Sequence, residues 1–166
     1  MRLFYALTLD AQTKKRLAKL RETARDYSPD ARFTPDENLH LTLVFLGEMP
    51  DAEMARRVLT RTRAHMKKEP IRLEFDGTRA LGEGILAVGV RKTPELMRLQ
   101  HALEAALIAE GFTPEKREFL PHVTLARRFS AQGWTPSFAP FSADAERVCL
   151  MRSEQTRGGV RYTEIL

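Results

Sequence analysis

The chain carries one short pattern, histidine–apolar–threonine–leucine, at two distant places. The first copy spans residues 40–43 and the second spans residues 122–125. Each copy lies in an apolar run typical of a β-strand, whose side chains alternate between two faces. His40 and Thr42 therefore share one face, and His122 and Thr124 share one face of the second strand. We expect the two polar faces to meet across a cleft and to do acid–base chemistry together.

Two imidazoles and two hydroxyls suit the hydrolysis of a phosphate ester. One group must take a proton from the attacking water, and another must protonate the leaving oxygen on the opposite side of phosphorus. Imidazole suits both roles near neutral pH because its ordinary pKa is about 6.5. The hydroxyls of Thr42 and Thr124 can donate to the non-bridging oxygens, where negative charge builds up in the transition state. This scheme requires neither a metal nor a cofactor.

A zinc site is the first alternative use of His40 and His122. Zinc needs a third or fourth ligand, and the residues two positions from each histidine include no Asp, Glu or Cys. A Ser-His-Asp triad is less favoured, because no serine lies in a Gly-flanked elbow. The other two histidines, His65 and His101, are expected on the exposed sides of helices.

The composition indicates one soluble globular unit with a modest basic excess. The chain has 166 residues, with 27 Lys and Arg against 22 Asp and Glu, which suits one domain and is compatible with an anionic partner such as RNA. No apolar run approaches the length of a membrane span. The single Cys149 excludes an internal disulfide, suggests a reducing, cytoplasmic setting, and is interpreted as a small buried residue.

The hydrophobic pattern predicts alternating strands and helices. Asp10 can cap a helix over about 11–26, a second helix is expected over 51–67, and Thr93 can cap a third that stops at Gly111. Residues 130–140 are expected to form a loop. Strands are expected at 2–9, 31–33, 39–46, 71–75, 85–90, 122–126, 147–153 and 160–165. This order predicts an α+β fold with antiparallel sheets.

With its two paired motifs, the sequence resembles a known family, the two-histidine phosphoesterase superfamily. The closer resemblance is to its RNA 2′,3′-cyclic phosphodiesterase branch, also named 2′-5′ RNA ligase. The similarity rests on residues 37–48 around the first motif, Gly111-Phe112, residues 121–127 around the second motif, and Tyr162 in the closing strand. Two departures stand out. Ala87 occupies a position where the family often has Trp, and the connection over residues 81–84 is short.

The resemblance implies a bilobal fold over residues 1–166, in which two antiparallel sheets of a pseudo-twofold duplication face a central cleft and helices lie on the outer faces. It implies hydrolysis of a 2′,3′-cyclic phosphate at an RNA 3′ end to a 2′-phosphate. It carries over His40 and His122 as the catalytic acid and base, Thr42 and Thr124 as phosphate-binding residues, and Arg127 as a phosphate contact. The implied partner is RNA or an oligonucleotide with this end, bound by a cytoplasmic monomer without membrane, metal or cofactor.

Arg127 poses a geometric problem, because it lies five residues after His122. On a regular strand this odd offset would point its side chain away from the imidazole, so a bulge or the end of the strand must turn it inward. Arg128 has the correct offset, but the family pattern favours Arg127. Two alternatives to hydrolysis stay open. One is an RNA end-binding module in which turnover is incidental, and the other is reversible 2′-5′ ligation at the same site.

Overall fold

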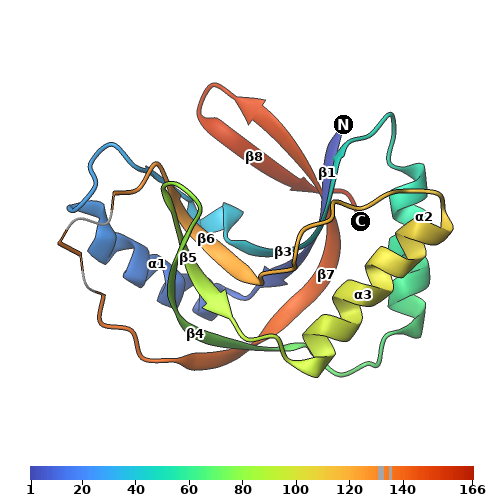
Figure 1. Ribbon diagram of the computed structural model, residues 1–166, viewed down its shortest axis with the longest axis horizontal. Coiled ribbons are helices and arrows are strands. Elements are labelled where there is room, and N and C mark those ends of the chain that lie inside the picture. The colour runs from blue at the N-terminus through green and yellow to red at the C-terminus, as the bar shows by residue number, and fades with distance from the viewer. Residues whose placement is uncertain (131–132, 135) are drawn as a thin grey trace.

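The computed structural model describes residues 1–130, 133–134 and 136–166. Within them the chain forms an α+β fold with three α-helices and one antiparallel sheet (Figure 1). No helix among these residues is long and apolar enough to cross a membrane. The elements in chain order are β1 (Arg2–Leu9), α1 (Ala11–Arg25), β2 (Arg32–Phe33), the 3-10 helix η1 (Asp36–Asn38), β3 (His40–Glu48), α2 (Glu53–His65), β4 (Arg72–Leu81), β5 (Ile85–Val90), α3 (Pro94–Ala109), β6 (His122–Arg127), β7 (Phe141–Thr156) and β8 (Gly159–Glu164).

The strands pair in the order β1-β3-β6-β5-β4-β7-β8, and β7 also pairs with β1. The pairings among the first six strands of this order therefore form a closed ring, from which the β7–β8 hairpin projects (Figure 1). The short strand β2 pairs with the end of β6. Strands β3 and β6 are joined by one residue pair, Leu41 opposite Val123. The two strands that carry the repeated motif are thus direct neighbours.

The sequence predicts two sheets, whereas the described strands form a single sheet. The continuity comes from β7, which is 16 residues long and pairs with β4 near its start, with β1 in its middle and with β8 at its end. The predicted α+β class and the antiparallel pairing are confirmed. The pseudo-twofold duplication stays a prediction.

Two of the predicted helix caps are confirmed. Asp10 Oδ1 accepts a hydrogen bond from the backbone N–H of Thr13 at 2.7 Å, at the start of α1. Thr93 Oγ1 accepts one from the N–H of Leu96 at 3.4 Å, at the start of α3. Each bond satisfies a backbone donor that the first turn of a helix would otherwise leave free. Helices α2 and α3 pack side by side, at the opposite end of the molecule from α1 (Figure 1).

Two strands are at least five residues longer than the sequence predicts. Strand β4 continues past residue 75 to Leu81, because its pairing with β5 resumes at Gly77 after a register shift at Asp76. Strand β7 begins at Phe141 rather than at 147, since residues 141–144 pair with β4. Of the predicted loop over residues 130–140, positions 131, 132 and 135 lie outside the described residues.

Strand β1 separates two apolar clusters of unequal size. Tyr5 and Leu7 point into the main core, whereas Phe4 and Ala6 point to the other side and pack with Cys149. Burial raises the pKa of the Cys149 thiol to about 12. This confirms the interpretation of the cysteine as a small buried residue, because a reactive thiol needs a lowered pKa.

Candidate active site

The pairing of β3 with β6 brings the two motifs together. Leu41 and Val123 oppose each other, and both point into the main core. Because the strands are antiparallel, each histidine lies across from the threonine of the other strand. These four polar side chains are half-buried on the side of the sheet opposite the core, which we call the histidine face. The structure therefore gathers, on one face, His40, Thr42, His122 and Thr124.

The same kind of hydrogen bond holds the two imidazoles. Nδ1 of His40 is 2.7 Å from the carbonyl oxygen of Asn38, and Nδ1 of His122 is 2.6 Å from that of Leu120. A carbonyl oxygen can only accept, so Nδ1 carries the proton in both rings. Nε2 is then the nitrogen that can exchange a proton with a ligand. Sequence reasoning missed these bonds, because a backbone carbonyl has no residue-type signal.

His40 is enclosed by neighbouring side chains. Its Nε2 lies 2.9 Å from Thr42 Oγ1, and the hydroxyl donates because Nε2 carries no proton in this tautomer. Its ring packs against the rings of Phe4 and Tyr162, at centroid distances of 5.1 and 5.0 Å. This burial lowers the pKa of His40 to about 4, since a buried imidazolium loses its hydration. In the free protein His40 is therefore neutral at neutral pH.

Positive charge gathers around His40. The hydrogen bond to the Asn38 carbonyl opposes the effect of burial on the pKa of His40, whereas the charges of Arg127 and Lys14, and that of His122 when its ring is protonated, lower this pKa further. Like charges disfavour a further charge nearby. The same field attracts an anion, so this part of the histidine face is electrostatically suited to a phosphate group.

His122 has smaller neighbours. Gly89 of β5 lies opposite His122, and Ala87 precedes Gly89 on the same face. A Cβ on Gly89 would lie 2.8 Å from Asp76 Oδ1 and 2.9 Å from Arg79 Nε. The ion pair between Asp76 and Arg79, 2.9 Å long, thus lies over Gly89 on the histidine face. Ala87 is fully buried and lies opposite Arg79 of β4.

A bulge in each motif strand changes which face the later residues occupy. The register of β3 against β1 shifts at Leu43, and the register of β6 against β5 shifts at Leu125. One extra residue reverses the alternation of faces beyond it. Arg127, the exposed last residue of β6, therefore lies on the histidine face. The bulge that its odd offset requires is present, and Phe45 occupies the equivalent position in β3.

Asn38 connects His40 to the β7–β8 hairpin. Its carbonyl accepts from His40, and its buried side-chain amide donates to the carbonyl oxygen of Val160 at 2.8 Å. Tyr162, two residues farther along β8, meets the His40 ring edge-on. The motif resemblance singled out Tyr162, but sequence reasoning missed the linking role of Asn38.

The remaining histidines are remote from this arrangement. His65 and His101 are exposed on α2 and α3, as predicted. Among the residues that the structure describes, no group of three or more His, Cys, Asp or Glu side chains is arranged to hold a metal ion.

Comparison with known sequences extends the resemblance over most of the chain. Residues 9–157 match the sequence model of the 2′-5′ RNA ligase superfamily. The RNA 2′,3′-cyclic phosphodiesterase of Escherichia coli strain K12 is 30% identical over 167 residues, which cover 99% of this chain and 93% of that protein. The protein of the same name from Geobacillus stearothermophilus is 28% identical over 148 residues, or 87% of this chain. This match spans 45% of the Geobacillus protein, so the chain corresponds to less than half of its length.

The fold has a similarly close counterpart among solved structures. The crystal structure of E. coli LigT complexed with 3′-AMP superimposes with a TM-score of 0.82 and 28% sequence identity. The similarity covers 99% of this chain and 95% of that chain.

Proposed function

The chain belongs to the 2′-5′ RNA ligase superfamily, and from this membership we propose that it is an enzyme that hydrolyses the 2′,3′-cyclic phosphate at an RNA 3′ end. The relatives that match it over most of its length are RNA 2′,3′-cyclic phosphodiesterases. In this proposal the catalytic residues are His40 and His122. The phosphate-binding residues are Thr42, Thr124 and Arg127, and neither a metal nor a cofactor takes part.

One observation supports hydrolysis by two histidines more strongly than the other observations do. Two neighbouring antiparallel strands present two imidazoles on one face, and each ring is held through Nδ1 so that Nε2 is available. A phosphate between the rings would have one Nε2 on the side of the attacking water and the other on the side of the leaving oxygen. An RNA end-binding module would not need both rings held in this way.

The reaction then needs two proton transfers and one displacement at phosphorus. Nε2 of His122 takes a proton from water, and the water oxygen forms a bond to phosphorus. The bond from phosphorus to the ribose 3′ oxygen breaks, and Nε2 of His40 gives its proton to that oxygen. The products are a 2′-phosphate and a free 3′ hydroxyl. Exchange of protons with solvent restores both rings.

The lowered pKa of His40 has to be overcome before this ring can act as an acid. The cyclic phosphate carries a negative charge, and an opposite charge at close range favours the protonated imidazole. Substrate binding therefore raises the pKa of His40 from its value in the free protein. Once Nε2 is protonated it no longer accepts from Thr42, and the Thr42 hydroxyl becomes available to a phosphate oxygen.

The direct test is incubation with an oligonucleotide that ends in a 2′,3′-cyclic phosphate, followed by chromatography and phosphorus NMR of the product. We expect a 2′-phosphate and a 3′ hydroxyl. A 3′-phosphate product would contradict the regiochemistry while keeping two-histidine chemistry. Tight binding without turnover would support the end-binding alternative, and joining to an RNA with a 5′ hydroxyl would reveal 2′-5′ ligation.

A sulfur-substituted substrate separates the acid from the base. When sulfur replaces the bridging 3′ oxygen, the leaving thiolate needs no proton. With His40 as the acid, His40→Ala should lose far less activity on the sulfur substrate than on the oxygen substrate. His122→Ala should lose activity on both. The reverse pattern would exchange the two roles.

We also propose how the whole chain is organised. Residues 1–166 form one compact bilobal unit, supported by the pairing of β7 with strands of both motif halves. Its two halves are related by a pseudo-twofold axis that passes between Leu41 and Val123, supported by the equivalent bulges at Leu43 and Leu125. The protein acts as a monomer. It is located in the cytoplasm, which the single Cys149 favours.

A further inference from the structure

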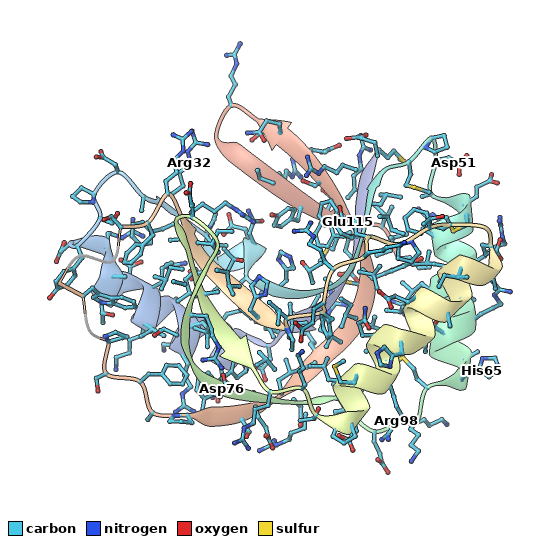
Figure 2. The ribbon with its side chains drawn as sticks, viewed as in Figure 1. Arg32, Asp51, His65, Asp76, Arg98 and Glu115 are labelled. Carbon is cyan, nitrogen blue, oxygen red and sulfur yellow. The ribbon has the colours of Figure 1, made fainter. Side chains whose placement is uncertain are left out.

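Two arginines face each other at the end of the second motif strand. Arg32 of β2 lies in register opposite Arg127 of β6, and the next pair, Phe33 and Ala126, points towards the core. Both arginines are exposed. Because directly opposed residues share a face, Arg32 lies on the histidine face beside Arg127. Figure 2 shows Arg32 reaching outward from the β2–β6 edge.

This arrangement is unfavourable for the protein alone. Like charges directly opposite each other on paired strands destabilise a sheet. Among the described residues, none of the ion pairs to carboxylates includes Arg32 or Arg127. Two guanidinium groups without a carboxylate partner form a site that an anion would stabilise, and phosphate matches the planar donor pattern of arginine.

The arginine pair lies on the same side of the reaction centre as His40. Along β6 the histidine face carries His122, then Thr124, then Arg127. His40 lies across from Thr124, so it is the nearer histidine to Arg127, and the charge of Arg127 acts on it. At the other end of the face the position equivalent to Arg127 is aromatic, since Phe45 stands there.

The position of His40 determines where the rest of the substrate lies. If His40 protonates the leaving 3′ oxygen, the terminal ribose lies on the His40 side of the reacting phosphorus. The phosphate on the 5′ side of that ribose then extends towards the β2–β6 edge.

We propose that Arg32, next to Arg127, binds the phosphate on the 5′ side of the terminal nucleotide and so selects an RNA 3′ end over a free nucleoside 2′,3′-cyclic phosphate. The inference rests on the proposed function and names the substrate feature that the same site reads. Arg32 does not touch the reacting atoms in this arrangement, so it determines specificity rather than catalysing the reaction.

A pair of small substrates isolates the single phosphate in question. A nucleoside 2′,3′-cyclic phosphate lacks the 5′ phosphate, and the same molecule phosphorylated at its 5′ oxygen adds that group alone. We expect Arg32→Gln to lower kcat/KM for the 5′-phosphorylated substrate about tenfold, the typical effect of a charge-assisted contact. Its kcat/KM for the unphosphorylated nucleoside should equal that of the natural protein.

Arg98→Gln provides the matched control, because Arg98 is an exposed arginine on α3, far from Arg32 (Figure 2). It should leave kcat/KM for both substrates unchanged. An equal loss on both substrates in Arg32→Gln, or no loss on either, would overturn the inference. Absence of turnover of either substrate by the natural protein would instead contradict the proposed function, so the two failures are distinguishable.

Discussion

At the scale of single residues, His40 and His122 occupy matched strand positions but have different surroundings. Phe4 and Tyr162 enclose His40, whereas small residues such as Gly89 flank His122. Enclosure lowers the pKa of His40 to about 4 and keeps the ring neutral in the free protein. At neutral pH, His40 therefore acquires the proton that the proposed acid donates only when an anion is bound.

The lowered pKa of His40 should make the protein less stable in acid. Between about pH 6.5 and pH 4 the unfolded chain binds a proton at this residue that the folded protein does not bind. The free energy of unfolding should therefore decrease as the pH falls through this window, by roughly 3 kcal/mol from His40 alone. Urea unfolding at pH 7 and at pH 4 measures the change.

The His40→Gln variant should lack this part of the pH dependence. His101→Gln, which changes an exposed ring on α3, should retain it. An unchanged difference in unfolding free energy between pH 7 and pH 4 in His40→Gln would show that other groups cause the acid sensitivity.

Removing either ring should abolish most activity without unfolding the protein. His40→Ala and His122→Ala should each lower the rate by about 10²–10⁴-fold, the usual contribution of a general acid or base. Thr42→Ala and Thr124→Ala should lose less, because each removes one neutral donor. Activity measured beside circular dichroism spectra tests both points. Near-normal turnover by folded His122→Ala would contradict the proposed mechanism. Inhibition by a chelator would instead support a metal-dependent mechanism.

At the scale of secondary-structure elements, residue alternation predicts which side chains share a face but not where that alternation breaks. The faces of the motif residues follow from period two, and the caps at Asp10 and Thr93 follow from residue type. The bulges at Leu43 and Leu125 do not follow, because leucine suits a regular strand equally well. Arg127 thus needed the structure before its face could be assigned.

Long-range pairing is the other part that local patterns miss. Strand β7 starts six residues earlier than predicted, because residues 141–144 pair with β4, far away in the sequence. Local patterns also did not predict the carbonyl groups that bind the two imidazoles, since the position of each carbonyl depends on how the chain enters the strand. Residue type supplied the reactive groups, and tertiary contacts supplied their orientation.

The turn before β3 should hold His40 through Asn38. Asn38→Ala removes the hydrogen bond to the Val160 carbonyl on β8 and should loosen both the turn and the hairpin. We expect a loss of about 1 kcal/mol in unfolding free energy and a lower kcat with little change in KM. Steady-state kinetics beside urea unfolding test this.

A matched variant separates position from stability. Thr23→Ala removes a side-chain hydrogen bond to the Leu20 carbonyl in α1, remote from both histidines, and should leave kcat unchanged. If kcat of Asn38→Ala equals that of the natural protein, Asn38 has only a structural role.

At the scale of the whole molecule, the two motifs lie where the ring of strands is joined by the fewest residue pairs, and this is the place of the proposed reaction. A single residue pair joins β3 to β6, whereas β7 gives the ring its long continuous side. The sequence predicts two halves because its motifs are duplicated. It could not predict their union into one sheet, which depends on β7 reaching strands of both halves.

The small number of proposed phosphate contacts predicts a shallow dependence of RNA binding on salt. The net charge is +5, and the proposed contacts involve the reacting phosphate and one neighbouring phosphate. Each neutralised phosphate of a single strand contributes a slope of about −0.7 in a plot of log affinity against log salt. We therefore expect a slope of about −0.7 to −1.4 for RNA binding in a titration across salt concentrations. A much steeper slope would indicate a surface that covers many phosphates. It would favour the alternative hypothesis of an RNA end-binding module.

The order in which the ribosome makes the strands determines when each strand can pair with its neighbours. Of the strands in this sheet, β1 emerges before the others, yet one of its two neighbours, β7, follows only after β2 to β6, with Arg2 finally opposite Ser153. Until then the nascent protein holds one edge of β1 without its permanent partner, and such edges promote aggregation. Tyr162, which encloses His40, arrives later still. The imidazole therefore acquires its enclosed environment only when translation has passed the β7–β8 hairpin, so a product terminated before it would carry both motifs without the enclosed His40 ring.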